Sequence, residues 1–331
     1  MSGSLPSVSV IIAARPDPDE VKAAAAARQF EYPPDKFEII IARGRQPSVQ
    51  RNAALKVARG DLVYFLDDDS VAPSGNLRRA APAFADPQVQ MLGGPNLCPP
   101  DAPELEQVFA LVLASWLAFG PSRARYSKVG PTRASGEKEL ILCNLVARKS
   151  ALLELGGFDE SLYPNEENAL MDALQRRGGR LIYDPEFFVY RRPRRTLKSF
   201  AKMLMTYGRG RAEQFRQLPT FGSALNFIPP LFCVYLLTLP VVCCITFAPG
   251  AEWLPAAYHL PLLAYCLAVF GQALALIPRG GFLRAMQAAP LIALSNILYG
   301  AGFWRGLFTR LRTDAAERAS EVRLETLKPL G

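Results

Sequence analysis

The fold is decided by one stretch, residues 62–70, which reads LVYFLDDDS. Its apolar start is rich in β-branched and aromatic residues, a pattern typical of a strand that is buried on both faces. Consecutive carboxylates follow the strand directly, and acidic groups this close repel one another. Such a cluster is useful at the carboxyl end of a strand, because α/β sheets hold their ligand crevices there. We therefore interpret the stretch as a central strand that ends at a binding site.

The acidic cluster has the chemistry of a divalent cation site. Mg²⁺ and Mn²⁺ prefer hard oxygen ligands and can link carboxylates to the phosphates of a substrate. The alternative is a solvated acidic turn, but a surface turn gains nothing from three adjacent like charges. The sequence therefore predicts a metal site at the end of this strand.

The first two thirds of the chain alternate apolar strands with helices of about a dozen residues, which predicts an α/β, mostly parallel sheet with flanking helices. No glycine-rich dinucleotide motif or P-loop follows the first strand. The expected strands are residues 8–14, 37–42, 62–66, 89–92, 140–146, 180–183 and 187–190; the expected helices are residues 17–30, 48–58, 75–85 and 165–177, with Ser48 as the N-cap of the second.

The last third of the chain is apolar. Residues 217–251, 253–278 and 285–304 carry no formal charge, and each run reaches the roughly 20 residues that cross a bilayer. Pro290, Ser295 and Asn296 interrupt the third run, so two to three transmembrane or re-entrant segments are expected. An earlier apolar run, residues 105–119, is too short to span and predicts either a core helix or an interfacial one.

Positive charge collects just before these runs. The whole chain has a net charge of +8. Residues 191–216 alone contain nine Lys or Arg and a single acid, with apolar residues at helical spacing between them. The pattern predicts a helix on an anionic membrane surface, whereas nucleic acid, the other partner for such a charge, does not explain the apolar runs that follow. The cations assigned to lipid phosphates are Arg191, Arg192, Arg194, Arg195, Arg209 and Arg211.

The charge pattern also indicates topology. Cytoplasmic loops carry an excess of Lys and Arg, which places the catalytic part in the cytoplasm at the inner (plasma) membrane. A third full crossing would move the Arg-rich tail, residues 309–331, to the outside. Two readings therefore stay open: the third segment is re-entrant or interfacial, or the rule fails here.

An ordered set of short motifs covers residues 8–190. After the opening strand stand QRN at 50–52, ARGD at 58–61, FLDDD at 65–69, CNLVARKSAL at 143–152, GGFDE at 156–160, NEE at 165–167 and YDP at 183–185. This set resembles the family 2 glycosyltransferases, which have a Rossmann-like GT-A fold. The later motifs YRRPR at 190–194 and YGRGR at 207–211, followed by apolar segments, resemble the membrane-bound members that build glycans on polyprenyl carriers.

The resemblance implies roles for the acidic residues. Asp67 and Asp69, with Asp68 beside them, would hold Mg²⁺ or Mn²⁺ on the diphosphate of a nucleotide-sugar donor. The pair Glu166-Glu167 would supply the general base for the acceptor hydroxyl. Adjacent helical residues point about 100° apart, so only one can aim at the hydroxyl. Motif position favours Glu167, with Glu166 as the alternative.

The resemblance also implies donor contacts at Ala14, Arg43, Arg51 and Asn144. The family often has an Asp pair after the second strand that reads uracil, whereas this chain has ARGR at residues 42–45. A cation cannot accept the N–H of the base, so a uridine donor is expected without that contact. The Gln-x-x-Arg-Trp signature of processive synthases is absent from the sequence, which predicts transfer of one sugar per encounter.

Together these patterns predict an inverting, metal-dependent glycosyltransferase that moves a sugar from a nucleotide-sugar to a polyprenyl-linked acceptor. The expected organisation is a GT-A domain at residues 1–192, basic interfacial helices at 193–222, a membrane domain at 223–308 and a polar tail at 309–331. Two alternatives are a membrane-anchored nucleotidyltransferase and a nucleotide-sugar-binding protein with a decayed site. A nucleotidyltransferase would require neither the Glu166-Glu167 helix nor the membrane segments.

Overall fold

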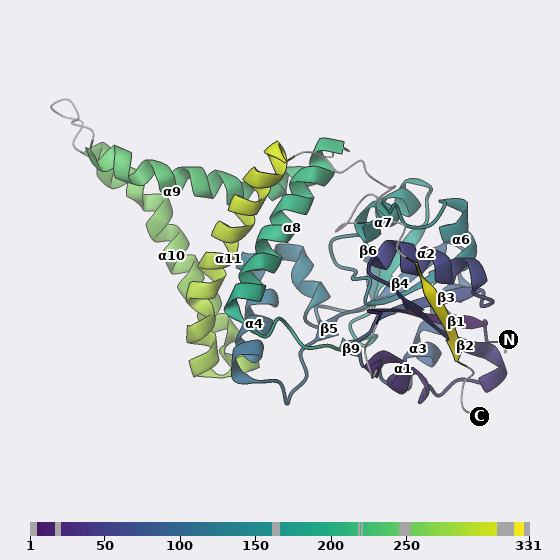
Figure 1. The fold of residues 1–331 in the computed structure, drawn as a ribbon. Helices are drawn as coiled ribbons and strands as arrows, with labels where there is room; N and C mark the ends of the chain where they lie inside the picture. Colours follow the sequence, from purple (N-terminus) through teal and green to yellow (C-terminus); the bar gives the residue numbers. More distant parts are fainter. Residues whose placement is uncertain are drawn as a thin grey trace. The chain divides into compact units, whose positions relative to one another are not determined.

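The computed structural model describes residues 5–16, 21–160, 166–217, 219, 221–244, 253–309 and 321–327. The chain divides into two compact units. The sheet unit consists of Met1–Pro99, Pro121–Arg192 and Arg312–Gly331, and the helical unit consists of Pro100–Gly120 and Pro193–Leu311. Figure 1 shows the strands gathered in the first unit and the long helices in the second.

The sheet unit holds one eight-stranded sheet among the described residues. Its strands are β1 (Val8–Ala14), β2 (Phe37–Arg43), β3 (Leu62–Asp67), β4 (Val89–Gly93), β6 (Arg133–Ser135), β7 (Asn144–Arg148), β8 (Arg180–Tyr183) and β10 (Arg323–Leu327). They lie in the order β10-β2-β1-β3-β7-β4-β8-β6. The strands β1, β2, β3, β4 and β8 run one way, and β6, β7 and β10 run the other. The predicted α/β, mostly parallel sheet is confirmed.

Helices cover both faces of this sheet. Because side chains alternate along a strand, Val10 and Ile12 of β1 join one apolar cluster and Ile11 joins the other. The first cluster includes side chains from α1 and α3, and the second includes side chains from α2, α6 and α7 (Figure 1). The bounds of these helices are α1 (Lys22–Ala27), α2 (Pro47–Val57), α3 (Asn76–Ala80), α6 (Lys149–Glu154) and α7 (Glu166–Arg176), with 3-10 turns η1 (Pro34–Lys36) and η2 (Ala81–Ala85).

Several boundaries differ from the sequence prediction. Ser48 is not the N-cap of α2: the helix starts at Pro47, and Gln46 occupies the cap position without a side-chain hydrogen bond. Proline suits the first helical position because the amide N–H it lacks has no partner there. The strand expected at residues 140–146 is shifted to β7, and Leu140 and Leu142 are buried ahead of it. The expected start of the first helix at residues 17–20 lies outside the described residues.

The C-terminal strand β10 was missed. It pairs antiparallel with β2 and brings Glu325 opposite Ile41. The prediction treated residues 309–331 as a polar tail, because the short alternation RLETL is weak as a strand signal on its own. Pairing with β2 supplies the partner that makes it a strand.

The helical unit consists of helices of very different lengths. They are α4 (Glu104–Leu113), α5 (Trp116–Phe119), η3 (Gly120–Arg125, which continues into the sheet unit), α8 (Leu197–Gln217), η4 (Phe221–Phe227), α9 (Ile228–Cys244), α10 (Trp253–Gly280) and α11 (Phe282–Phe308). In the described residues, Ala224–Cys244 and Trp253–Gly280 are long and apolar enough to cross a membrane. Glu104–Leu113 and Trp116–Arg125 pass the same test only together, and they are bent by 62°.

The helices α8 and α11 pack backbone against backbone. A Cβ added to Gly208 of α8 would meet the carbonyl of Tyr299, and a Cβ added to Gly302 of α11 would meet the backbone of Met205. Such small residues let two helices approach closely. Pro290 does not interrupt α11, which is continuous and buries Ser295 and Asn296. The basic stretch from residue 197 onward thus forms one long helix, and its Gly208 faces α11.

Candidate active site

The acidic cluster sits at the end of the central strand. β3 is paired on both edges, with β1 and with β7, and Asp67 is its last residue. The chain then turns, because the Ser70 N–H donates to the Asp67 carbonyl at 3.0 Å. Asp68 and Asp69 therefore lie in a turn at the carboxyl end of a fixed strand. This is where the sequence placed them.

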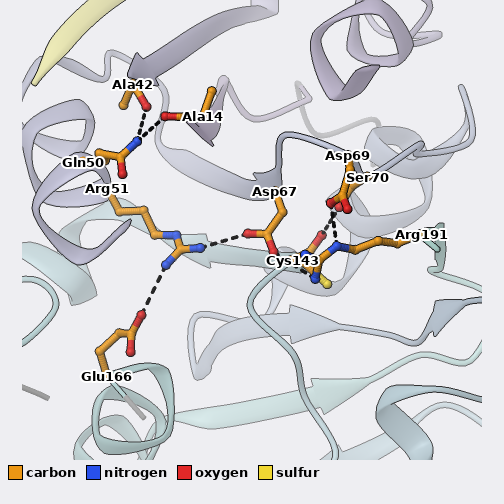
Figure 2. A network of polar contacts seen from close by, with 10 residues as sticks. All are labelled: Ala14, Ala42, Gln50, Arg51, Asp67, Asp69, Ser70, Cys143, Glu166 and Arg191. Carbon is orange, nitrogen blue, oxygen red and sulfur yellow. Dashed lines mark hydrogen bonds and ion pairs between the residues drawn. The ribbon is translucent and has the colours of Figure 1, made fainter. Parts of the chain in front are cut away.

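Arg191 joins two of the carboxylates. Its Nη1 lies 3.0 Å from Asp67 Oδ2, and its Nε lies 2.5 Å from Asp69 Oδ1 (Figure 2). Burial opposes the charge of Arg191, yet the pKa of its guanidinium is raised well above the ordinary value because ionised Asp67 and Asp69 lie beside it. The basic run of the sequence predicted Arg191 to be one of the lipid-binding cations. In the structure it instead follows β9 (Val189–Tyr190) and lies in the acidic site.

A second arginine connects the acidic cluster to the acidic helix. Arg51 of α2 places Nη2 3.0 Å from Asp67 Oδ1 and Nη1 3.4 Å from Glu166 Oε1 (Figure 2). The Arg51 and Glu166 side chains are 7% and 4% exposed. Because a buried charge needs a partner, this chain of ion pairs fixes the first turn of α7 relative to Asp67. Glu167, the next residue, is half-buried.

Asp68 differs from its neighbours. Burial raises its pKa, the Asp69 carboxylate raises it further, and the exposed Arg15, whose Nε lies 3.7 Å from Asp68 Oδ2, offsets part of the effect. A carboxyl group with a raised pKa gives up its proton less readily. A raised pKa makes Asp68 a weaker candidate ligand, and the assignment of a cation to Asp67 and Asp69 stays a prediction.

The acidic pair fits a divalent cation. Asp67 and Asp69 already converge on one positive group, the Arg191 guanidinium, so their oxygens can face a common point. Within the described ranges, no group of three or more His, Cys, Asp or Glu side chains is arranged for a metal ion. Two carboxylates nevertheless suffice for Mg²⁺, which usually keeps waters and takes its other ligands from substrate phosphates.

The remaining predicted donor residues have different environments. Ala14 ends β1, and its carbonyl accepts a hydrogen bond of 2.7 Å from Gln50 Nε2, which also donates to the Ala42 carbonyl at 2.5 Å. Arg43 ends β2, where its Nε lies 3.0 Å from Glu325 Oε1. Ala14, Arg43 and Asp67 all lie at the carboxyl ends of their strands, and these ends are adjacent because β1, β2 and β3 are parallel and in register.

Asn144 is buried in the sheet unit. Its Oδ1 accepts from the Tyr64 hydroxyl at 2.8 Å, and its Nδ2 donates to the Phe187 carbonyl at 2.7 Å. These bonds satisfy the amide inside the protein and give Asn144 a structural role. Its contact with a donor stays a prediction.

The other basic residues assigned to lipid lie outside the acidic site. Arg192, Arg194 and Arg195 are exposed. On α8, Arg209 Nε lies 3.3 Å from Glu213 Oε1, and Arg211 Nη1 donates to Gln214 Oε1 at 3.0 Å. Their contact with lipid phosphates also stays a prediction.

The arrangement defines a class of protein. A mostly parallel sheet with flanking helices, paired carboxylates after its central strand and an acidic helix linked to them is the GT-A type of glycosyltransferase. A solved structure supports this fold: the mannosyltransferase PcManGT from Pyrobaculum calidifontis, in complex with GDP-Man and Mn²⁺, matches with a TM-score of 0.58 at 16% identity, over 92% of this chain and 88% of that one.

Sequence comparison identifies the family. The family model for "Glycosyl transferase family group 2" matches residues 62–277, and the model for "Glycosyl transferase family 2" matches residues 6–108. The chain belongs to glycosyltransferase family 2. It is also 28% identical over 173 residues to a pre-mycofactocin glycosyltransferase of Mycobacterium tuberculosis, a match that covers 49% of this chain and 33% of the relative. The matched region is thus about a third of that relative's length.

Proposed function

We propose that the protein is an inverting, metal-dependent glycosyltransferase that transfers one sugar at a time from a UDP-linked donor to a polyprenyl-linked acceptor. The observation that carries the proposal is the continuous set of ion pairs from Asp69 through Arg191, Asp67 and Arg51 to Glu166 (Figure 2). It brings the donor end of the site and the acidic helix into one network.

Asp67 and Asp69 would hold the Mg²⁺ or Mn²⁺ ion. When bound, the ion would neutralise charge on the departing nucleoside diphosphate. The convergence of the two carboxylates on one guanidinium supports this assignment. The matched mannosyltransferase structure contains Mn²⁺ together with a nucleotide-sugar.

Glu167 would act as the general base. It would accept the proton of the acceptor hydroxyl while that oxygen forms a bond to the anomeric carbon. The bond from this carbon to the phosphate oxygen breaks, and the nucleoside diphosphate leaves with the electron pair. A single in-line displacement inverts the configuration. Glu166 is held by Arg51 at 3.4 Å, which makes it the positioning member of the pair.

The sheet restricts how the chain can cross a membrane. β4 and β7 lie in one sheet, although the bent pair of α4 and α5 lies between them in sequence. A single crossing by this pair would put the two strands on opposite sides of the bilayer, so we propose that the pair makes no such crossing. β10 pairs with β2 although α8 to α11 come before it. We therefore propose that α8–α11 cross the bilayer an even number of times.

Two crossings, by the candidate spans Ala224–Cys244 and Trp253–Gly280, satisfy this requirement. The third apolar segment, α11, would then begin and end on the same side of the bilayer. It packs on α8 at Gly302 and Gly306. We assign the side that holds the sheet unit, including β10, to the cytoplasm at the inner membrane, because the basic residues of 192–216 precede the first span. A membrane-anchored site of this kind suits a lipid-linked acceptor.

The proposal is tested by a donor and acceptor panel. Purified full-length protein in detergent would be incubated with Mn²⁺ and UDP- or GDP-linked sugars, alone and with polyprenyl phosphate or polyprenyl-diphosphate-sugar. We expect release of nucleoside diphosphate that depends on one lipid acceptor, with a glycosylated lipid of inverted anomeric configuration. Donor binding without release would favour a nucleotide-sugar-binding protein with a decayed site. Release of pyrophosphate from a sugar phosphate and a nucleoside triphosphate would instead indicate a nucleotidyltransferase.

A further inference from the structure

We propose that Arg191 occupies the cation position between Asp67 and Asp69 until a divalent cation binds, and that it then moves to the donor's diphosphate. The inference rests on the proposed metal-dependent function and assigns a second role within the same site. The central observation is that one guanidinium contacts both carboxylates, at 3.0 Å and 2.5 Å. A metal ion and the Arg191 guanidinium would bind the same carboxylate oxygens, so the two cations compete for Asp67 and Asp69.

The backbone around Arg191 is fixed, so the exchange has to involve the side chain. The Arg191 N–H donates to the Leu97 carbonyl at 2.9 Å. Just before it, Tyr190 and Val71 exchange two backbone hydrogen bonds, at 2.8 and 2.9 Å. Val71 itself follows the acidic turn, so the root of the Arg191 side chain is held beside the carboxylates. A long arginine side chain on a fixed root can swing between neighbouring anions.

The two arginines at Asp67 differ in how freely they can move. The Arg191 side chain is 26% exposed and the Asp69 side chain is 44% exposed, so a hydrated ion can reach this end. The Arg51 side chain is 7% exposed and also pairs with buried Glu166. Arg51 is therefore expected to stay on Asp67, while Arg191 is the group that exchanges.

Charge balance gives the exchanged arginine its destination. The linked carboxylates of Asp67, Asp69 and Glu166 carry three negative charges, of which Arg191 and Arg51 already offset two. A divalent ion adds two positive charges at a few ångströms from a guanidinium, which is unfavourable unless anions arrive with it. A diphosphate supplies them, and guanidinium groups bind phosphate oxygens with paired N–H donors. The cation and the donor are thus expected to bind cooperatively, with Arg191 as the link.

The test measures metal and nucleotide binding separately from turnover. Mn²⁺ binding to full-length protein in detergent is titrated by EPR, and UDP and GDP binding in saturating Mn²⁺ by calorimetry. The variants are Arg191→Gln, Arg191→Lys and, as a matched control, Arg180→Gln, which removes a positive charge from an exposed ion pair with Asp86. Thermal unfolding checks that each variant is folded.

Arg191→Gln should bind Mn²⁺ alone at least about tenfold more tightly than the wild type, a gain of about 1.4 kcal/mol, since its competitor is gone. It should also bind the nucleoside diphosphate about tenfold more weakly in Mn²⁺, a loss of the same size. Arg191→Lys keeps the positive charge, so its affinities for Mn²⁺ and for the nucleoside diphosphate should stay close to those of the wild type. Both affinities of Arg180→Gln should match the wild type.

Two results overturn the inference. If the wild type binds a nucleoside diphosphate in a Mn²⁺-dependent way but Arg191→Gln leaves Mn²⁺ affinity unchanged or weaker, Arg191 is a fixed structural partner and the proposed function stands. If neither protein binds Mn²⁺ with or without nucleotide, the metal role itself fails, and the inference fails with it.

Discussion

The two units of this glycosyltransferase differ in how deeply their ion pairs are buried. The helical-unit pairs Arg209–Glu213 and Arg284–Glu104 are more exposed than the Arg51–Glu166 pair of the sheet unit. In the sheet unit, charged groups meet in pairs, as between Arg51 and Glu166 or between Arg79 and Asp184, whose Nε and Oδ2 atoms lie 2.7 Å apart. In the helical unit, Gly208 and Gly302 let backbones touch. The first unit should therefore be sensitive to the loss of charge at constant shape, and the second to added volume at constant charge.

The largest effect is expected in the sheet unit, at the proposed base. Glu167→Gln keeps the shape and removes the charge, and loss of a general base typically costs about a hundred- to ten-thousandfold in rate. Nucleoside diphosphate affinity should hardly change, since Glu167 would face the acceptor. Glu166→Gln should be milder, because it disturbs Arg51 and acts through it. Turnover and UDP binding of both variants in Mn²⁺ decide the matter: an active Glu167→Gln beside an inactive Glu166→Gln moves the base by one residue.

The next effect is expected at the acidic turn. Asp69→Asn removes one charge from the proposed metal site and should lower transfer by about a hundredfold or more, about 2.7 kcal/mol in the barrier. The fold should remain, because the Asp69 side chain is 44% exposed. Initial rates over a Mn²⁺ titration measure the loss, and circular dichroism serves as the control. An unchanged rate at limiting Mn²⁺ would remove Asp69 from the metal site.

In the helical unit, volume should matter instead. Gly302→Val adds atoms where a Cβ already meets the Met205 backbone, and overpacking of this kind costs typically about 1–3 kcal/mol. The matched control is Gly271→Val in α10, where an added Cβ meets nothing within 4 Å. Thermal unfolding in detergent should show a clear decrease for the first variant and little change for the second. Equal behaviour would mean that close packing of α8 on α11 is not what stabilises this unit.

The smallest effect is expected at the edge of the sheet. Glu325→Gln breaks the pair with Arg43, whose side chains are 28% and 18% exposed. Partly exposed ion pairs contribute at most about 1 kcal/mol, so global stability should barely change. Hydrogen exchange of the β10 amides should nevertheless become faster, while exchange in β3 stays slow. Protection of β10 that is identical in both proteins would show that backbone pairing alone holds the strand.

The sequence was informative where neighbours along the chain determine the outcome. An apolar run followed by carboxylates predicted β3 and its turn, and the helical spacing of Glu166 and Glu167 predicted that the two side chains differ in direction. The structure shows one of them buried against Arg51. Alternation of strands and helices likewise predicted the sheet, because local periodicity and burial on both faces are properties of each segment alone.

It was uninformative where distant segments meet. Arg191 pairs with a residue 122 positions away, and in the sequence it is one of a run of cations, so nothing separated it from the arginines predicted to contact lipid. Glu325 pairs with Arg43 across 282 positions, and β10 becomes a strand only beside β2. The Lys and Arg of residues 191–216 predicted a membrane-surface helix, and nothing in the sequence indicated that Gly208 contacts α11, since close contact between distant helices has no local signature.

We propose that sugar transfer requires a divalent cation held by Asp67 and Asp69. The most direct measurement is transfer by the wild-type protein after removal of metal with EDTA and dialysis, followed by titration with Mn²⁺ or Mg²⁺. If Asp67 and Asp69 hold this cation, transfer should be lost without metal, return with either ion, and not return in Asp69→Asn at the same ion concentration. Full transfer by the wild type in excess EDTA would contradict it.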